Sequence, residues 1–220
     1  MMQIRYTLLV IIAGTLSMYC QTPSNAVHLW DGKNLDHWEF INKSGAAIHS
    51  VCQYDTGRVL AVEGTPLGYL ATIDSFENYK LHVECRWAHG AAQNSNSGVL
   101  IHIASGPVDR GLWPICFQVQ MKISRAGDIL PMAGAKFAEP LSSAPDAKTP
   151  LRERRESDSE RPLGEWNIVE IICSRDTLTC TVNGVMQNQV SQCMPQRGKI
   201  GIQLEGTPFE LRNIWLTSRE

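Results

Sequence analysis

Four strand-like segments of the chain carry polar side chains at alternate positions: YKLHVECRW (79–87), GVLIHI (98–103), CFQVQMKI (116–123) and KIGIQLE (199–205). Because successive side chains of a strand point to opposite faces, each segment separates into an apolar set and a polar set. The polar sets comprise Lys80, His82, Glu84, Arg86, His102, Gln118, Gln120, Lys122, Gln203 and Glu205. Side chains of these types can transfer protons, bind a cation or hydrogen-bond a polar ligand.

The polar sets have two interpretations. If the sheet that carries them is flat or convex, the side chains are simply solvated. If the sheet is concave, it could hold a sugar, because the hydroxyl groups of a sugar need both donors and acceptors. Trp113, in GLWPICF, also has two interpretations: its indole could stack on a pyranose ring or pack in the core.

The elements that must position these side chains are β-strands. From Val27 onward, period-two runs bounded by Gly, Pro, Asn and Asp recur, which predicts an all-β, two-sheet antiparallel sandwich. Asn183-Gly184 lies between two such runs and predicts a type I′ hairpin. The expected strands are Arg58 to Val62, Tyr79 to Trp87, Gly98 to Ile103, Cys116 to Ile123, Trp166 to Cys173, Thr177 to Val182, Val185 to Val190, Lys199 to Leu204 and Phe209 to Leu216.

The stretch from Leu141 to Pro162 is rich in Pro, Ser and charge and lacks apolar periodicity. It predicts a long surface loop that crosses between two halves of the strand array. The alternative is that this loop folds over a binding face.

The N-terminal residues have the features of a secretory leader. Arg5 precedes an uncharged apolar run from Tyr6 to Leu16, and Ser24-Asn25-Ala26 has the spacing of a signal-peptidase site. We therefore expect a signal peptide over 1–26, a single β-sandwich domain over 27–220, and a periplasmic or extracellular location. A lipid anchor at Cys20 is the alternative, disfavoured by the bulky residues just before it. No run approaches the roughly 20 apolar residues of a membrane span.

Charge and cysteine content exclude several classes of protein. The formal net charge of -2 provides no field to attract nucleic acid. The cysteines after the leader fit buried free thiols, and no CxxC pair indicates a zinc site. The sequence also contains no GxSxG, HExxH, P-loop or dinucleotide-binding motif.

Short segments in a fixed order resemble the 3-keto-disaccharide hydrolase family, formerly a domain of unknown function. They are LWDGKNLDHWEF, ENYKLHVECRW, NSNSGVLIHI, LWPICFQVQM, AGDI, PLGEWNIVEI, VNG and GKIGIQLEGTPFELRNIWL, spanning about Val27 to Leu216. The resemblance implies a concanavalin A-like lectin/glucanase jelly roll and a small-molecule carbohydrate substrate, a glycoside oxidised to a ketone at C3.

Such a ketone acidifies the C2 proton, so that a base can form an enolate, the C1 substituent can leave, and water can add. The route needs a base near C2, an acid near the leaving oxygen, and hydrogen-bond donors or a divalent cation for the enolate oxygen. His102 is the leading candidate for proton transfer or metal ligation. Glu84 and Glu205 are candidates for acid, base or ligand roles, with Glu84 and His102 as potential metal ligands.

The remaining candidates would bind the substrate: Gln118, Gln120, Asn96 and Trp113, with Lys122 or Arg86 stabilising negative charge. Relatives commonly carry Glu at the position of Gln118, and an amide cannot act as a base. A non-catalytic lectin-like module is therefore one alternative to the 3-keto-glycoside enzyme. A conventional glycosidase with two opposed carboxylates is the other.

Overall fold

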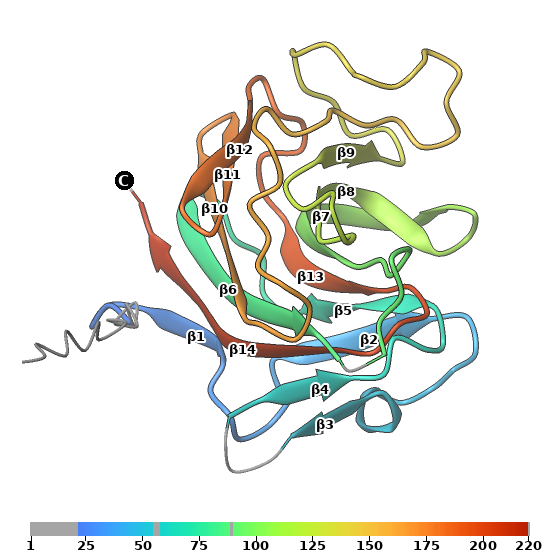
Figure 1. Ribbon diagram of the computed structural model, residues 1–220, viewed down its shortest axis with the longest axis vertical. Helices are drawn as coiled ribbons and strands as arrows, with labels where there is room; N and C mark the ends of the chain where they lie inside the picture. The colour runs from blue at the N-terminus through green and yellow to red at the C-terminus, as the bar shows by residue number, and fades with distance from the viewer. Residues whose placement is uncertain (1–21, 55–57, 89, 220) are drawn as a thin grey trace, which may run out of the picture.

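Two antiparallel sheets lie face to face in this protein (Figure 1). The structure, a computed structural model, describes residues 22–54, 58–88 and 90–219. Most of the expected signal peptide therefore lies outside the described residues. Within the described residues, the only helical element is a short 3-10 turn, η1 (Ile48–Ser50). The predicted all-β, two-sheet jelly-roll sandwich is confirmed.

The larger sheet contains eight strands. Seven follow the order β12-β11-β10-β6-β14-β4-β3, and β1 pairs with the C-terminal half of β14. Their bounds are β1 (Val27–Trp30), β3 (Cys52–Tyr54), β4 (Leu60–Val62), β6 (Tyr79–Trp87), β10 (Asn167–Ser174), β11 (Thr177–Val182), β12 (Val185–Val190) and β14 (Phe209–Ser218).

The smaller sheet contains six strands in the order β2-β5-β13-β7-β8-β9. Their bounds are β2 (Trp38–Asn42), β5 (Gly68–Thr72), β7 (Gly98–Asp109), β8 (Trp113–Gln120), β9 (Ile129–Met132) and β13 (Lys199–Leu204). The central strands β13, β7 and β8 carry three of the four polar segments identified from the sequence. The fourth, on β6, belongs to the other sheet.

The core fills the space between the two sheets. It is built from the apolar sets of the alternating strands, such as Leu81 and Val83 on β6 and Ile200 and Ile202 on β13, all essentially inaccessible to solvent. Burial of this apolar surface is the main force that holds the sheets together. The six cysteines of the described residues are buried free thiols, as expected from their strand positions.

The long loop before β10 is tied to both sheets. Arg152 forms two backbone hydrogen bonds with Ile129 on β9, at 2.8 and 2.9 Å, and so extends the edge of the six-stranded sheet. Its guanidinium Nε donates to Asn188 Oδ1 on β12 at 3.1 Å. The loop therefore crosses from one sheet to the other at this end of the sandwich.

Candidate functional site

A cleft of about 820 Å³ opens on the outer face of the six-stranded sheet, opposite the core. We call it the polar cleft. Its floor and walls carry Asn96, Gln118, Gln120, Lys122, Asp128, Gln203 and Glu205. Its rim is formed by residues 108–110, 130–134 and 148–151 together with Trp113 and Glu153. The rim includes part of the long loop, so that loop borders the cleft. A cleft of this size lies within the range of small-molecule binding sites.

Three glutamines form the floor of the polar cleft. Gln118 Nε2 donates to Gln120 Oε1 at 2.6 Å and to Gln203 Oε1 at 2.7 Å. Gly98 on the adjacent strand makes room for them, because a Cβ at that position would lie 2.7 Å from Gln118 Cγ and Nε2. Gln118 and Gln203 are only 2% and 4% exposed. The linked amides form a rigid floor that offers a ligand both donors and an acceptor.

Glu205 lies at one end of this floor, just after β13. Asn96 Nδ2 donates to Glu205 Oε2 at 2.6 Å and fixes the orientation of the carboxyl group. Burial raises the pKa of Glu205, while the Asn96 bond and the charges of Arg110 and Lys122 act against that rise. A carboxylate with a raised pKa is a stronger base, which suits proton abstraction.

Asp128 is a second cleft carboxyl group, in the connection between β8 and β9. Its side chain accepts a hydrogen bond from the Arg154 backbone N–H at 2.8 Å, and the residue is 2% exposed. Burial raises the pKa of Asp128, opposed by the Arg154 N–H and the charge of Arg125. Asp128 is not among the candidates predicted from alternation, because it lies outside the strands, although it belongs to the AGDI segment that contributed to the family resemblance.

The other half of this sheet face is apolar. Trp113 lies 6.4 Å from Tyr69 between ring centroids, with an interplanar angle of 31°. The two rings belong to a small cluster with Ala71, Leu100, Ile103, Leu112 and Cys116. Trp113 is 7% exposed and also lines the cleft, so it both packs in this cluster and borders the site.

The expected position of His102 on the polar face is wrong. His102 adopts a φ of 55°, and the register of β7 against β13 shifts between Leu100 and Ile103. This β-bulge puts Leu100 and Ile103 on the same face and turns His102 toward the core. A single extra residue in the strand thus reversed the alternation from which its position was predicted.

Within the core, the His102 ring packs edge-on against Tyr79 of the opposite sheet, 5.7 Å between centroids. Its Nδ1 donates to the Pro195 carbonyl oxygen at 3.2 Å, and the residue is 2% exposed. Burial lowers the pKa of His102 to about 4, which the Pro195 bond only partly offsets. The structure therefore gives His102 no access to a ligand in the polar cleft.

Glu84 and Arg86 also lie away from the polar cleft. Both are on the outer face of the eight-stranded sheet, where Glu84 accepts from Arg212 Nε and from Asn213 Nδ2, each at 2.7 Å. Arg86 pairs with Glu210 and lies 4.6 Å above the Trp166 ring. Alternation assigned these side chains to the correct face of β6, but it does not reveal which sheet contains β6. The structure therefore does not bring the candidates Glu84 and His102 together with Glu205.

The charged side chains on the outer face of the eight-stranded sheet stabilise the fold, and their contribution to the free energy of unfolding should depend on pH. His82 stacks on Trp215, with 4.6 Å between ring centroids, and lies 3.5 Å from carboxylate oxygens of Glu84 and Glu170. Burial opposes charge on Glu84, but hydrogen bonds from His82, Asn213 and Arg212 outweigh it and lower the pKa of Glu84 to about 2. Burial alone would lower the pKa of His82, but the two carboxylates reverse that direction and raise it.

We expect Glu84→Gln to weaken the loss of stability at low pH. The lowered pKa of Glu84 stabilises the fold above the unfolded value near 4.5, and this contribution disappears as the pH falls toward 2. Allowing for coupling to His82, it amounts to roughly 2 kcal/mol. Urea unfolding measures the free energy of unfolding at pH 7 and at pH 3. Between these two pH values it should fall less in the variant than in the wild type, by that amount. An equal drop in both proteins would contradict the assignment, and exposed Glu63→Gln is the control.

The cleft residues do not form a recognisable metal centre. Over the described part of the chain, no three or more His, Cys, Asp and Glu side chains gather closely enough to hold a metal ion. The sequence-based candidates, His102 and Glu84, lie in the core and on the opposite sheet. The residues present therefore do not fit a divalent cation, and we assign no step to one.

Structural comparison identifies the same fold in carbohydrate-related proteins. A candidate glycosyl hydrolase from Parabacteroides distasonis is 15% identical, with a TM-score of 0.64 over 89% of this chain and 95% of that one. A Bacillus licheniformis β-glucanase is 8% identical, with a TM-score of 0.56 over 90% and 100%. A carbohydrate-binding module from Bacillus subtilis is 9% identical, with a TM-score of 0.55 over 83% and 96%. At these identities the likeness shows the fold alone.

Sequence comparison gives the family. No curated protein matches the sequence. In the part of the chain that the structure describes, no helix has the length and apolarity to cross a bilayer. The profile of the 3-keto-alpha-glucoside-1,2-lyase-like domain matches residues 25–217, nearly all of the sandwich. The chain therefore belongs to the family of 3-keto-alpha-glucoside-1,2-lyase-like domains, a family of carbohydrate-active proteins.

Proposed function

We propose that the polar cleft binds 3-keto-glycosides and cleaves them by elimination followed by hydration. The observation that carries this proposal is the position of Glu205, a partly buried carboxyl group with a raised pKa, beside a floor of hydrogen-bonding amides. The leader-like N-terminal residues further suggest that the reaction takes place outside the cytoplasm.

Glu205 is the proposed base. Its carboxylate removes the C2 proton, which the neighbouring ketone acidifies, and the electron pair is held as an enolate whose oxygen lies at C3. The enolate then expels the C1 substituent, breaking the C1–O bond and forming a C1=C2 double bond. Water adds its oxygen to C1, a proton returns to C2, and the net reaction is hydrolysis.

Two further groups complete this assignment. Lys122, close enough to influence the pKa of Glu205, would stabilise the negative enolate oxygen together with the amide N–H groups of the floor. Asp128, whose pKa is also raised, would donate a proton to the leaving oxygen. Trp113, at the apolar side of the cleft, would contact the sugar ring or the aglycone.

A sugar-binding protein without catalytic activity is the second candidate. Gln118 favours it, because an amide, which cannot act as a base, occupies the centre of the floor. In this reading the three amides hold the sugar and no base acts on it.

The two candidates differ in turnover. The test is to incubate the protein with para-nitrophenyl 3-keto-α-glucoside and with the unoxidised glucoside, each with and without a chelator, and to follow nitrophenol release. We expect release from the 3-keto compound only. Binding of the 3-keto compound without release would favour the sugar-binding protein, and release from the unoxidised glucoside would indicate a conventional glycosidase.

We expect Gln118→Glu to increase the rate of release, by roughly tenfold. The side chains are almost the same size, and rotation of the Gln120 and Gln203 amides would direct N–H groups toward the new carboxylate. A second carboxylate among amides would then be available for proton transfer. The kcat of the variant on the 3-keto compound measures this, and a rate equal to that of the wild type would exclude a base at this position.

A further inference from the structure

The long loop before β10 fixes the connection that carries two side chains of the polar cleft. Residues 121–128 join β8 to β9 and include Lys122 and Asp128, which both line the cleft. Residues 152–160 of the long loop hydrogen-bond to this connection, and we call them the strap. The strap follows residues 148–151, which form part of the cleft rim. The positions of these cleft side chains therefore depend on a segment that is distant in the sequence.

Arg154 makes two of the contacts between the strap and the connection. Its backbone N–H donates to Asp128 Oδ1 at 2.8 Å, and its guanidinium Nη1 donates to the Ser124 carbonyl oxygen. Asp128 is only 2% exposed, so a hydrogen bond to one oxygen restricts the rotation of the whole carboxyl group. Among the residues that the structure describes, Asp128 Oδ2 has no hydrogen-bond partner. Oδ2 is therefore the oxygen that is left to hold a transferable proton.

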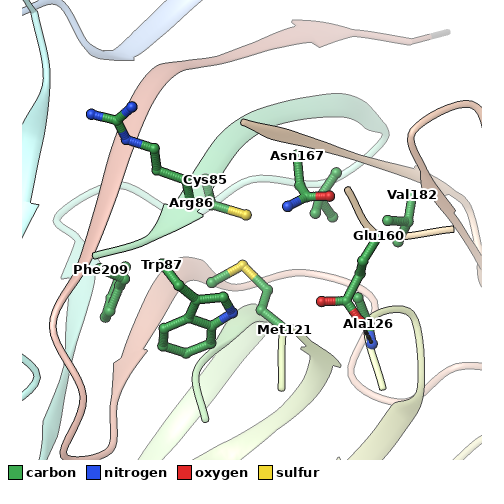
Figure 2. A pocket seen from close by; sticks show the side chains of 10 residues that line it. Cys85, Arg86, Trp87, Met121, Ala126, Glu160, Asn167, Val182 and Phe209 are labelled. Carbon is green, nitrogen blue, oxygen red and sulfur yellow. Dashed lines mark hydrogen bonds between the residues drawn. The ribbon is translucent and has the colours of Figure 1, made fainter. Parts of the chain in front are cut away.

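Glu160 holds the other end of the strap on the same connection. Its Oε2 accepts a hydrogen bond from the Ala126 backbone N–H at 3.3 Å. Figure 2 shows the Glu160 carboxyl group beside Ala126, across a small cavity from Trp87 and Met121. The cavity has a volume of about 20 Å³, which is room for about one water molecule. This end of the strap is therefore packed closely against the sandwich.

The eight-stranded sheet anchors the strap through two amides on β12. Gln187 and Asn188 are both 0% exposed. Asn188 Nδ2 donates to the carbonyl oxygens of Gly127, in the connection, and Glu153, in the strap, each at 3.2 Å. Gln187 Nε2 donates to the Ser157 carbonyl oxygen at 3.0 Å. Because a buried amide without its partners is costly, these bonds hold the strap and the connection in one arrangement.

We propose that Arg154 is a positioning residue of the polar cleft, which holds Asp128 in the orientation in which Oδ2 gives its proton to the leaving oxygen. This role rests on the proposed function, in which Asp128 is the acid. Acid catalysis matters most for a poor leaving group, because an alkoxide leaves slowly without a proton whereas nitrophenolate leaves readily. Loss of the orientation should therefore slow the release of a poor leaving group more than that of a good one.

The test compares para-nitrophenyl and methyl 3-keto-α-glucosides, with each kcat taken at the pH optimum of the protein that is measured. Arg154→Ala should raise the ratio of the nitrophenyl kcat to the methyl kcat by about tenfold, a part of what a general acid contributes. Asp128→Asn should raise this ratio at least as much. Arg154→Lys keeps a donor for the Ser124 oxygen and should restore part of the difference. The ratio does not depend on the folded fraction, because both substrates are measured on the same preparation.

Arg155→Ala is the matched control, because Arg155 is the next residue of the strap, is exposed and does not line the polar cleft. It should keep the wild-type ratio. A ratio that rises in Asp128→Asn but not in Arg154→Ala would overturn the positioning role and leave Asp128 as the acid. A wild-type ratio in both variants would remove Asp128 as the acid and the role of Arg154 with it. Failure of the wild type to release either leaving group would overturn the proposed function itself.

Discussion

Replacing Glu205 with Gln should reduce kcat on a 3-keto-glucoside by about 100-fold or more. The substitution preserves the size of the side chain and an oxygen that can accept the Asn96 bond, now at 2.6 Å. It removes the ability to accept a proton, and general base catalysis commonly contributes a factor of this size. Because substrate contacts would largely remain, KM should change much less than kcat. Initial rates of leaving-group release over a range of substrate concentrations measure both constants.

Glu63→Gln is the matched control, since Glu63 is exposed and does not line the polar cleft. Its kcat should equal that of the wild type. If Glu205→Gln retained wild-type kcat, Glu205 would be excluded as the base and Asp128, the buried carboxyl group of the cleft, would become the next candidate.

The second large effect concerns stability. His102→Ala should lower the free energy of unfolding by about 3 kcal/mol, because it leaves a cavity beside Tyr79 and an unpaired carbonyl at Pro195. Urea unfolding at pH 7 measures this change. At temperatures at which the variant is still folded, the kcat per folded molecule should remain close to that of the wild type, because His102 does not reach the polar cleft.

His102→Gln offers a milder form of the same test, since its amide can still donate to the Pro195 oxygen. It should recover part of the lost stability. Loss of turnover in a fully folded His102 variant would contradict the core position and return His102 to the catalytic site.

The fold was largely predictable from alternation along single strands. β6, β11, β12 and β13 have the predicted bounds, and the Asn183-Gly184 turn has the positive φ angles of 50° and 82° that a type I′ hairpin needs. Strand β5 was missed because its five residues are all buried, so GYLAT shows no alternation. β1, β3 and β9 are three or four residues long, too short for a periodic signal.

The candidate site was only partly predictable, because alternation describes one strand at a time. It placed Gln118, Gln120 and Gln203 on one face, and these three meet at the cleft floor. It could not reveal that Glu84 and Glu205 belong to different sheets, since strand order depends on long-range pairing. The bulge at His102 has no glycine or proline to mark it, so the sequence offered no warning of the reversal.

The most direct test of the proposed reaction is cleavage of the 3-keto-glucoside in D2O. Elimination removes the C2 proton and hydration returns one from solvent, so the first product formed should carry deuterium at C2. A parallel incubation of the free 3-keto sugar corrects for spontaneous exchange, and early time points are read by mass spectrometry. Deuterium at C2 above that correction is the predicted result; a product that keeps its original C2 hydrogen while the glycoside is cleaved would contradict the proposed chemistry of the polar cleft.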